Sequence, residues 1–167
     1  MANPPITIGP FANVPAPGSP IKSDWPQQVS QFVYDKRIGN LSVVTGGTDQ
    51  IISSSTYVDV TGATLTFTAV AGRRYRYAFD CNLYPQVYTA GMQAEVSITN
   101  PGGGLIVHRS VTIPANLSTV AFRVEWVETP GAGSITRKVQ ASVTGGQLAV
   151  LGSSSRNWQF TVEDVGL

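Results

Sequence analysis

Cysteine and histidine are almost absent from this chain of 167 residues, since each occurs once, as Cys81 and His108. A single cysteine cannot form a disulfide within one chain, and one cysteine with one histidine falls short of the ligand set of a structural zinc site. No short segment carries the cluster of acidic residues that calcium-binding loops need. The sequence therefore predicts neither a disulfide framework nor a metal site, and it gives no reason to expect a cofactor.

Charged residues are also scarce, at 13% of the chain with a formal net charge of +1, which is about half the usual share. A nearly neutral chain has little electrostatic attraction for nucleic acid or anionic lipid. The sequence has no basic segment followed by an apolar run, as in secretory signals, and no apolar run long enough for a membrane-spanning helix. We therefore expect no nucleic-acid or membrane partner and a reducing cytoplasm as the site of folding, and the low charge favours an oligomer.

Helix signals are confined to residues 23–37, SDWPQQVSQFVYDKR. Asp24 and Gln27 form a capping pair, and Pro26 lies in the first turn, where its missing N–H does no harm. Apolar residues then recur at helical spacing and form one stripe. A helix this short is unstable alone, so its stripe is expected to rest on the body of the protein or on another chain. The stripe consists of Trp25, Val29, Phe32 and Val33.

Proline is concentrated at the start of the chain, where seven of its eleven copies lie within 26 residues. Residues 1–22 therefore cannot form a helix or a central strand, because proline lacks the N–H that both need. Apolar residues are spaced through the segment, which is unusual for a polar linker. We expect an extended arm that docks on a partner, since prolines restrict the free chain and lower the entropy lost on docking. The predicted partner-binding residues are Phe11, Val14, Pro15, Pro17, Ile21 and Trp25.

Residues 40–167 show the alternation of apolar and polar residues that is typical of strands with one buried face. The clearest case is residues 74–83, RYRYAFDCNL, in which every second residue is apolar. Trp126 belongs to the expected inward face of another such segment. The other clear strand candidates are residues 64–70, 120–127, 135–143 and 158–165, and the weaker ones are 41–45, 48–53, 57–60, 93–99, 104–108 and 147–151.

Glycine- and proline-rich turns separate these segments, and no helical pattern lies between them. Short strands at near-even spacing predict an all-β protein, an antiparallel β-sandwich or jelly roll. The stretch 84–92, YPQVYTAGM, is expected to be a long loop. The chain thus divides into an arm at 1–22, a short helix at 23–37 and a β-sandwich at 40–167.

Three runs carry a resemblance to a known family: TLTFTAVAGRRYRYAFDCNL, PGAGSITRKVQASV and a last strand ending FTVEDVG. They resemble a β-domain common in structural proteins of tailed bacteriophages, a domain similar to the trimeric jelly roll of tumour necrosis factor and C1q. The start, PFANVPAPGSPIKSDWPQQV, resembles the leader of such virion proteins, whose arm attaches them to the capsid or tail. We expect no further domain after the jelly roll, which favours a short fibre or decoration protein.

The resemblance implies a homotrimer that docks on the major capsid protein and is located in the virion, after assembly in the cytoplasm of a bacterial host. The alternative partners are tail or neck proteins. In such trimers aromatic residues often fill the seam near the threefold axis. Tyr75, Tyr77 and Phe79 are therefore candidates for the trimer interface, although the sequence leaves open whether they fill the seam or the core of the sandwich.

Signals for catalysis are weak, and we expect no enzyme. His108 lies in a strand-like segment, LIVHRSV, and no G-x-S-x-G nucleophile motif is present. Cys81 falls on an apolar face, as a small buried hydrophobic residue does. Glu163 and Asp164 are adjacent, so on a strand they point to opposite faces and cannot form a glycosidase pair.

Two groups of residues, an arginine cluster and a set of aromatic residues, have more than one interpretation. Arg73, Arg74 and Arg76 form a positive cluster, either as a solvated strand face or as a contact to an acidic capsid surface or a neighbouring subunit. Tyr84, Tyr88 and Trp126 would line a sugar-binding surface if their rings were exposed, which would make the chain a lectin-like module that binds host-surface glycan. The leading expectation is a non-enzymatic, trimeric decoration or head-fibre protein.

Overall fold

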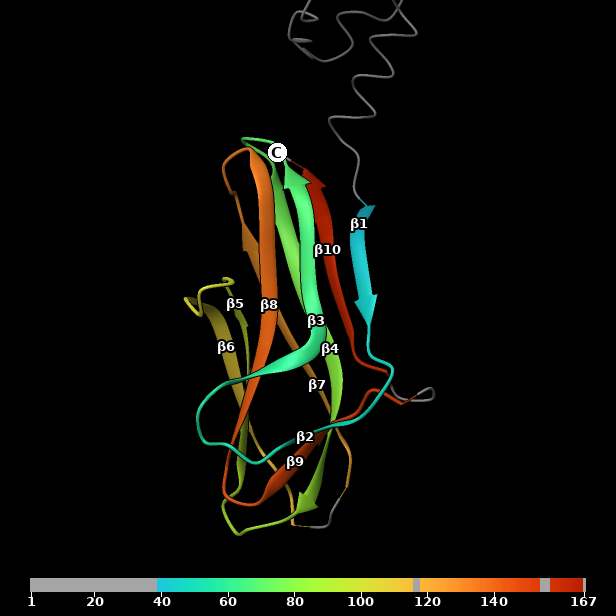
Figure 1. Cartoon of the computed structure of the whole chain (residues 1–167), viewed down its shortest axis with the longest axis vertical. Helices are drawn as coiled ribbons and strands as arrows, with labels where there is room; N and C mark the ends of the chain where they lie inside the picture. The colour runs from blue at the N-terminus through green and yellow to red at the C-terminus, as the bar shows by residue number, and fades with distance from the viewer. Residues whose placement is uncertain (1–38, 116–117, 154–156, 167) are drawn as a thin grey trace, which may run out of the picture.

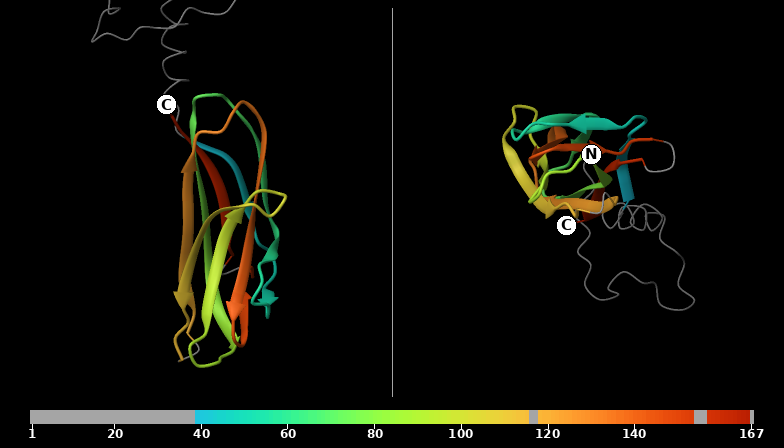
Figure 2. Two further views of the ribbon diagram at one scale, coloured as in Figure 1. Left: turned by 90° about the vertical axis from the view of Figure 1, so that its left-hand side faces the viewer. Right: turned by 90° about the horizontal axis from the view of Figure 1, so that it is seen from below.

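The computed structural model describes residues 39–115, 118–153 and 157–166, and within these ranges it contains ten strands and no helix. The strands form two antiparallel sheets that pack face to face around one interior (Figures 1 and 2). The predicted arm and helix, at 1–22 and 23–37, lie outside the described residues. The strands are β1 Gly39–Thr45, β2 Gln50–Ile52, β3 Val58–Ala69, β4 Arg74–Val87, β5 Gln93–Thr99, β6 Leu105–Thr112, β7 Val120–Glu128, β8 Gly133–Thr144, β9 Gln147–Val150 and β10 Gln159–Gly166.

The first sheet, which we call sheet A, is organised around the long strand β4. Strand β7 pairs with one edge of β4. Strands β10 and β9 share the other edge, where β10 pairs with the first part of β4 and β9 with its last part. Outside them, β1 pairs with β10 and β2 pairs with β9. The second sheet, sheet B, has the order β3-β8-β5-β6. Successive strands lie in alternate sheets from β2 to β5 and again from β6 to β9. This arrangement confirms the predicted jelly-roll β-sandwich.

The core lies between the sheets and is built from the residues that the alternation predicted to face inward. Leu65 and Phe67 of β3, and Phe160 and Val162 of β10, are all buried. Aromatic rings dominate the contacts, with the ring centroids of Phe67 and Tyr75 5.0 Å apart. Such tilted ring pairs stabilise a core beyond the area that they bury.

The three residues considered for the trimer interface belong to this core. Tyr75, Tyr77 and Phe79 have exposed fractions of 1%, 0% and 0% within the single chain. Phe79 packs between Trp158 and Phe160, at centroid distances of 5.7 and 6.1 Å. Side chains enclosed by their own sandwich are not available to a neighbouring subunit. The sequence left open whether these residues fill the core of the sandwich or the seam of a trimer. Their burial within one chain assigns them to the core, so they are no longer candidates for the trimer interface.

Two strands are longer than the sequence indicated. Segments 57–60 and 64–70 belong to one strand, β3, whose register shifts between Asp59 and Thr64. Strand β4 continues to Val87, into the stretch expected to be a loop. Pro85 is tolerated because the pairing with β7 ends at Leu83, so that among the described residues one edge of β4 has no neighbouring strand at Pro85.

One side of the sandwich is open between β7 and β8. Strand β5 ends at Thr99, opposite Lys138, so the first residues of β8 have no partner strand on that side. In Figure 1, β8 accordingly reaches well beyond the tip of the β5–β6 hairpin. Trp126 faces the interior, as predicted, but keeps 42% of its surface exposed at this opening.

An ion pair crosses the interior at the same opening. Arg137 of β8 donates from Nε to Oε1 of Glu128 on β7, at 3.1 Å. The same carboxylate oxygen accepts the hydroxyl of Tyr77 at 2.7 Å, and the guanidinium lies 5.7 Å from the Tyr77 ring centroid. The network thus ties the edge of sheet A to sheet B where no strand closes the gap.

The outer face of sheet B is polar, and one contact on it titrates at high pH. Tyr57 donates its hydroxyl to Glu95 at 2.7 Å. Partial burial, followed by this hydrogen bond and the charge of Glu95, raises the pKa of Tyr57 to about 12. Because an unfolded tyrosine loses its proton near pH ~10, the contact stabilises the fold fully below that pH and less as the pH rises toward 12.

We therefore expect the stability difference between the native protein and Tyr57→Phe to shrink between pH ~10 and ~12. Urea unfolding at several pH values measures the difference, and all groups other than Tyr57 titrate in both proteins. A difference that stays constant across this range would contradict the assignment.

Candidate functional site

Sheet A is interrupted where β9 ends and β10 begins. Val150, at the end of β9, pairs with Leu83, whereas Gln159, at the start of β10, pairs with Asp80. Among the described residues, the stretch of β4 between them has no regular partner strand on that edge, although the N–H of Leu151 donates to the carbonyl of Asn82 at 2.9 Å. A depression of about 310 Å³ lies at this interruption.

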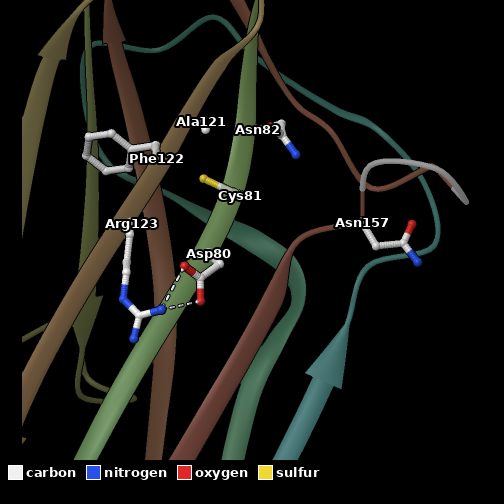
Figure 3. A pocket seen from close by; sticks show the side chains of 7 residues that line it. All are labelled: Asp80, Cys81, Asn82, Ala121, Phe122, Arg123 and Asn157. Atoms are coloured by element: carbon white, nitrogen blue, oxygen red, sulfur yellow. Dashed lines mark hydrogen bonds and ion pairs between the residues drawn. The ribbon is translucent and has the colours of Figure 1, made fainter.

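The depression is lined by two strands and one connection (Figure 3). Asp80 and Asn82 project from β4, Arg123 reaches across from the neighbouring β7, and Asn157 lies on the other side of β4. The remaining lining residues are small or apolar: Cys81, Ala121 and Phe122.

The charges of the lining neutralise one another. The Nη1 atom of Arg123 lies 3.1 and 3.0 Å from the two carboxylate oxygens of Asp80. Its Nε and Nη2 atoms bind Glu125, at 3.1 and 3.0 Å. Partial burial acts to lower the pKa of Arg123, but the hydrogen bonds and negative charges of Glu125 and Asp80 outweigh this and raise it. The guanidinium therefore stays charged and is already engaged.

The two amides of the lining have no such partner. No hydrogen bond connects the side chain of Asn82 or Asn157 to another residue of the described ranges. Each amide offers two N–H donors and one carbonyl acceptor. The depression is thus equipped for hydrogen bonding to a bound molecule.

None of the described lining residues is prepared for catalysis. Cys81 is buried, as predicted, and burial raises the pKa of its thiol well above the ordinary value, which leaves it protonated. His108 lies on β6 of the other sheet, exposed and opposite Ser97. Within the described residues, no three side chains of the His, Cys, Asp and Glu types gather in a metal-binding arrangement.

The arginine cluster is partly used within the chain. Arg73 is buried and donates to both carboxylate oxygens of Asp164, from Nε at 2.6 Å and from Nη2 at 2.9 Å. Arg76 binds Glu163, with Nε at 3.0 Å. The adjacent acids face opposite sides of the sheet, as predicted, and each meets its own arginine. Arg74 is exposed.

The three aromatic residues considered for sugar binding do not form one surface. Tyr84 is half-buried and shares the outer face of sheet A with Asn82. Tyr88 packs against the hydrophobic core, and Trp126 lies at the open side of the sandwich. The predicted partner-binding residues of the arm, from Phe11 to Trp25, lie outside the described residues.

Sequence reasoning did not identify the residues of the depression. Asp80 and Asn82 are the polar members of the alternation in residues 74–83, and Arg123 holds the same place in β7. They come together through strand pairing across 43 positions of sequence. The interruption between β9 and β10 also has a weak sequence signal, the run GSSSRN, in which turn residues cluster.

Comparisons with known proteins yield distant structural likenesses. No protein-family model and no curated protein sequence matches the chain. Among solved structures, the chain is similar to the VP2 subviral particle of infectious bursal disease virus, with 12% identity and a TM-score of 0.42 over 80% of this chain and 38% of that chain. The Gx strain of the same virus gives 14% identity and a TM-score of 0.39, over 80% and 38%.

A bacteriophage protein is also among the similar structures. The enzymatically active domain of tailspike protein 4 from bacteriophage CBA120 matches with 15% identity and a TM-score of 0.29, over 81% of this chain and 20% of that chain. This chain therefore spans less than two fifths of the length of the solved structures that it matches. Among the described residues, no helix has the length and apolar character that crossing a membrane requires.

Proposed function

We propose that this chain is a non-enzymatic structural protein of a bacteriophage virion: a trimeric decoration or short head-fibre protein that docks on the major capsid protein through its N-terminal arm. The observation that carries the proposal is the strand order β1-β10-β4-β7 over β3-β8-β5-β6. It is the jelly roll that the resemblance to phage structural proteins implied. Assembly in the bacterial cytoplasm and incorporation into the virion follow from this role.

The geometry of β1 suits attachment by one end. Gly39, the first described residue, pairs with Asp164 near the end of β10, and Asp164 pairs with Tyr75 near the start of β4. The chain thus enters the sandwich at the end where β10 finishes, as Figure 1 shows at the top. An arm bound to a shell would hold the sandwich by this end and leave the opposite end facing solvent. Three arms on a symmetric host would add avidity.

Deleting residues 1–22 tests the anchoring role. We expect the truncated protein to lose co-sedimentation with purified particles, whereas the full chain sediments with them, because the predicted apolar anchors are gone. Urea unfolding of the free proteins should be unchanged, since the described sandwich is retained. A truncated protein that still sediments at the full stoichiometry would show that the arm is not the anchor.

A matched variant separates anchors from chain length. Phe11→Ser, Val14→Ser and Ile21→Ser together keep every proline and should weaken co-sedimentation with particles as strongly as the deletion does.

The number of copies per particle decides between the structural alternatives, because hundreds of copies indicate capsid decoration and a few trimers indicate a tail or neck protein. Light scattering at micromolar concentration should give a mass of three chains, and a monomer mass would contradict the trimer.

A further inference from the structure

The depression at the interruption of sheet A points to a ligand, and we propose that it binds a small, neutral, hydroxylated molecule of the class of a monosaccharide unit. The inference goes beyond the proposed virion role and does not rest on it. It is carried by three properties of the described lining: amides without a partner among the described residues, charges that are already engaged, and a limited volume.

The amides set the kind of hydrogen bonding. Asn82 and Asn157 each present donors and an acceptor, and neither side chain is bound to another described residue. A sugar hydroxyl both donates and accepts, so adjacent hydroxyls can bind the N–H and the carbonyl of one amide at the same time. In Figure 3 the two side chains lie on the same side of β4, and both residues line the depression.

The charges argue against an anionic ligand. The donors of Arg123 already bind Asp80 and Glu125, with Nη1 and Nη2 each 3.0 Å from a carboxylate oxygen. Because the guanidinium of Arg123 already faces these two carboxylates, it is not free to bind phosphate, sulfate or an acidic sugar. The carboxylate of Asp80 keeps free lone pairs, which a hydroxyl can use as acceptors.

The size of the depression fits a single sugar unit. A volume of about 310 Å³ is at the lower end of the range of ~300–1,000 Å³ found for ligand pockets. Ala121 is the apolar side chain on this face, whereas Cys81 belongs to the hydrophobic core and Phe122 packs against that core. Because the lining contains no exposed aromatic platform, we expect weak binding by one site, strengthened when several copies engage one surface.

A matched series of ligands tests the class. The full chain, labelled with ¹⁵N, is titrated with glucose, glucuronate, glucosamine and inorganic phosphate, and then with methyl glycosides of other neutral sugars. We expect at least one neutral sugar to shift the side-chain NH₂ signals of Asn82 and Asn157 more than its charged analogues do. The proposal is overturned if no neutral sugar shifts these signals, or if glucuronate or phosphate shifts them as strongly.

Three variants locate the binding. Replacing both Asn82 and Asn157 by alanine should weaken the sugar about tenfold or more, because each lost hydrogen bond weakens binding several-fold. Ala121→Trp keeps both amides but fills the depression with a bulky side chain, and should abolish the shifts. Gln93→Ala, which removes an exposed amide on sheet B, should leave the affinity unchanged.

The variants also separate this proposal from the virion role. Co-sedimentation with particles should be the same for all three, because none touches the arm. If Ala121→Trp does not fold, the double alanine variant still decides, since both of its substitutions are on side chains without partners among the described residues. Equal affinity of the double variant and the native chain would refute the site.

Discussion

Replacing Phe160 by alanine should lower the free energy of unfolding by about 3–5 kcal/mol. The ring is fully buried in β10, the strand between β1 and β4, and lies edge-on to Phe79 at 6.1 Å. Alanine would leave a cavity that the paired strands on both sides cannot close. Since domains of this size are stable by only about 5–15 kcal/mol, urea unfolding should show a large shift of the midpoint.

Thr161→Ala is the matched control, one position along the same strand. Thr161 faces the other side of the sheet and donates its hydroxyl to the carbonyl of Ala78 at 3.3 Å. We expect a cost of about 1 kcal/mol or less. If Phe160→Ala cost no more than this control, the packing of the core around β10 would differ from that described.

Replacing Arg137 by alanine should cost about 3 kcal/mol, because the substitution leaves Glu128 with a charge but without its cation between the sheets. The value is at the lower end of the usual range of ~3–5 kcal/mol for breaking a buried pair, since the Glu128 side chain keeps 21% of its surface in water. The loss should be measured by urea unfolding at neutral pH.

A double variant isolates the ion pair from the rest of the contact. Arg137→Met with Glu128→Gln removes both charges and keeps similar volumes, and a glutamine at position 128 still accepts the Tyr77 hydroxyl. We expect the double variant to be more stable than Arg137→Ala, because no buried charge is left unpaired. A double variant as unstable as the single one would show that packing, not charge, is what Arg137 contributes.

The fold was largely predictable because its signal is local. Alternation in residues 74–83 and 158–165 identifies which side of each strand is buried, since a strand turns successive side chains to opposite faces. The extension of β4 beyond Leu83 was missed because Pro85 normally ends a strand, and it is allowed here only by the missing neighbour on one edge.

The candidate site was not predictable in the same way, because it depends on which strands pair with each other. From the sequence alone, Asp80 is an ordinary solvent-facing residue of a strand. The pairing of β4 with β7 places Arg123 beside it. The choice between core and seam for Tyr75, Tyr77 and Phe79 has the same origin. Alternation shows that they share a face, but only the position of sheet B shows what covers that face.

The placement of β10 has a consequence for biosynthesis. This strand lies between β1 and β4, so residue pairs such as Val44 and Phe160 join the first and the last described strands. Until the ribosome has released residues 159–166, β1 has no strand to pair with and the aromatic side chains of β4 lack one flank of their sheet. Topologies with such long-range pairing fold slowly. We therefore expect the nascent chain to complete this sheet only after the synthesis of β10.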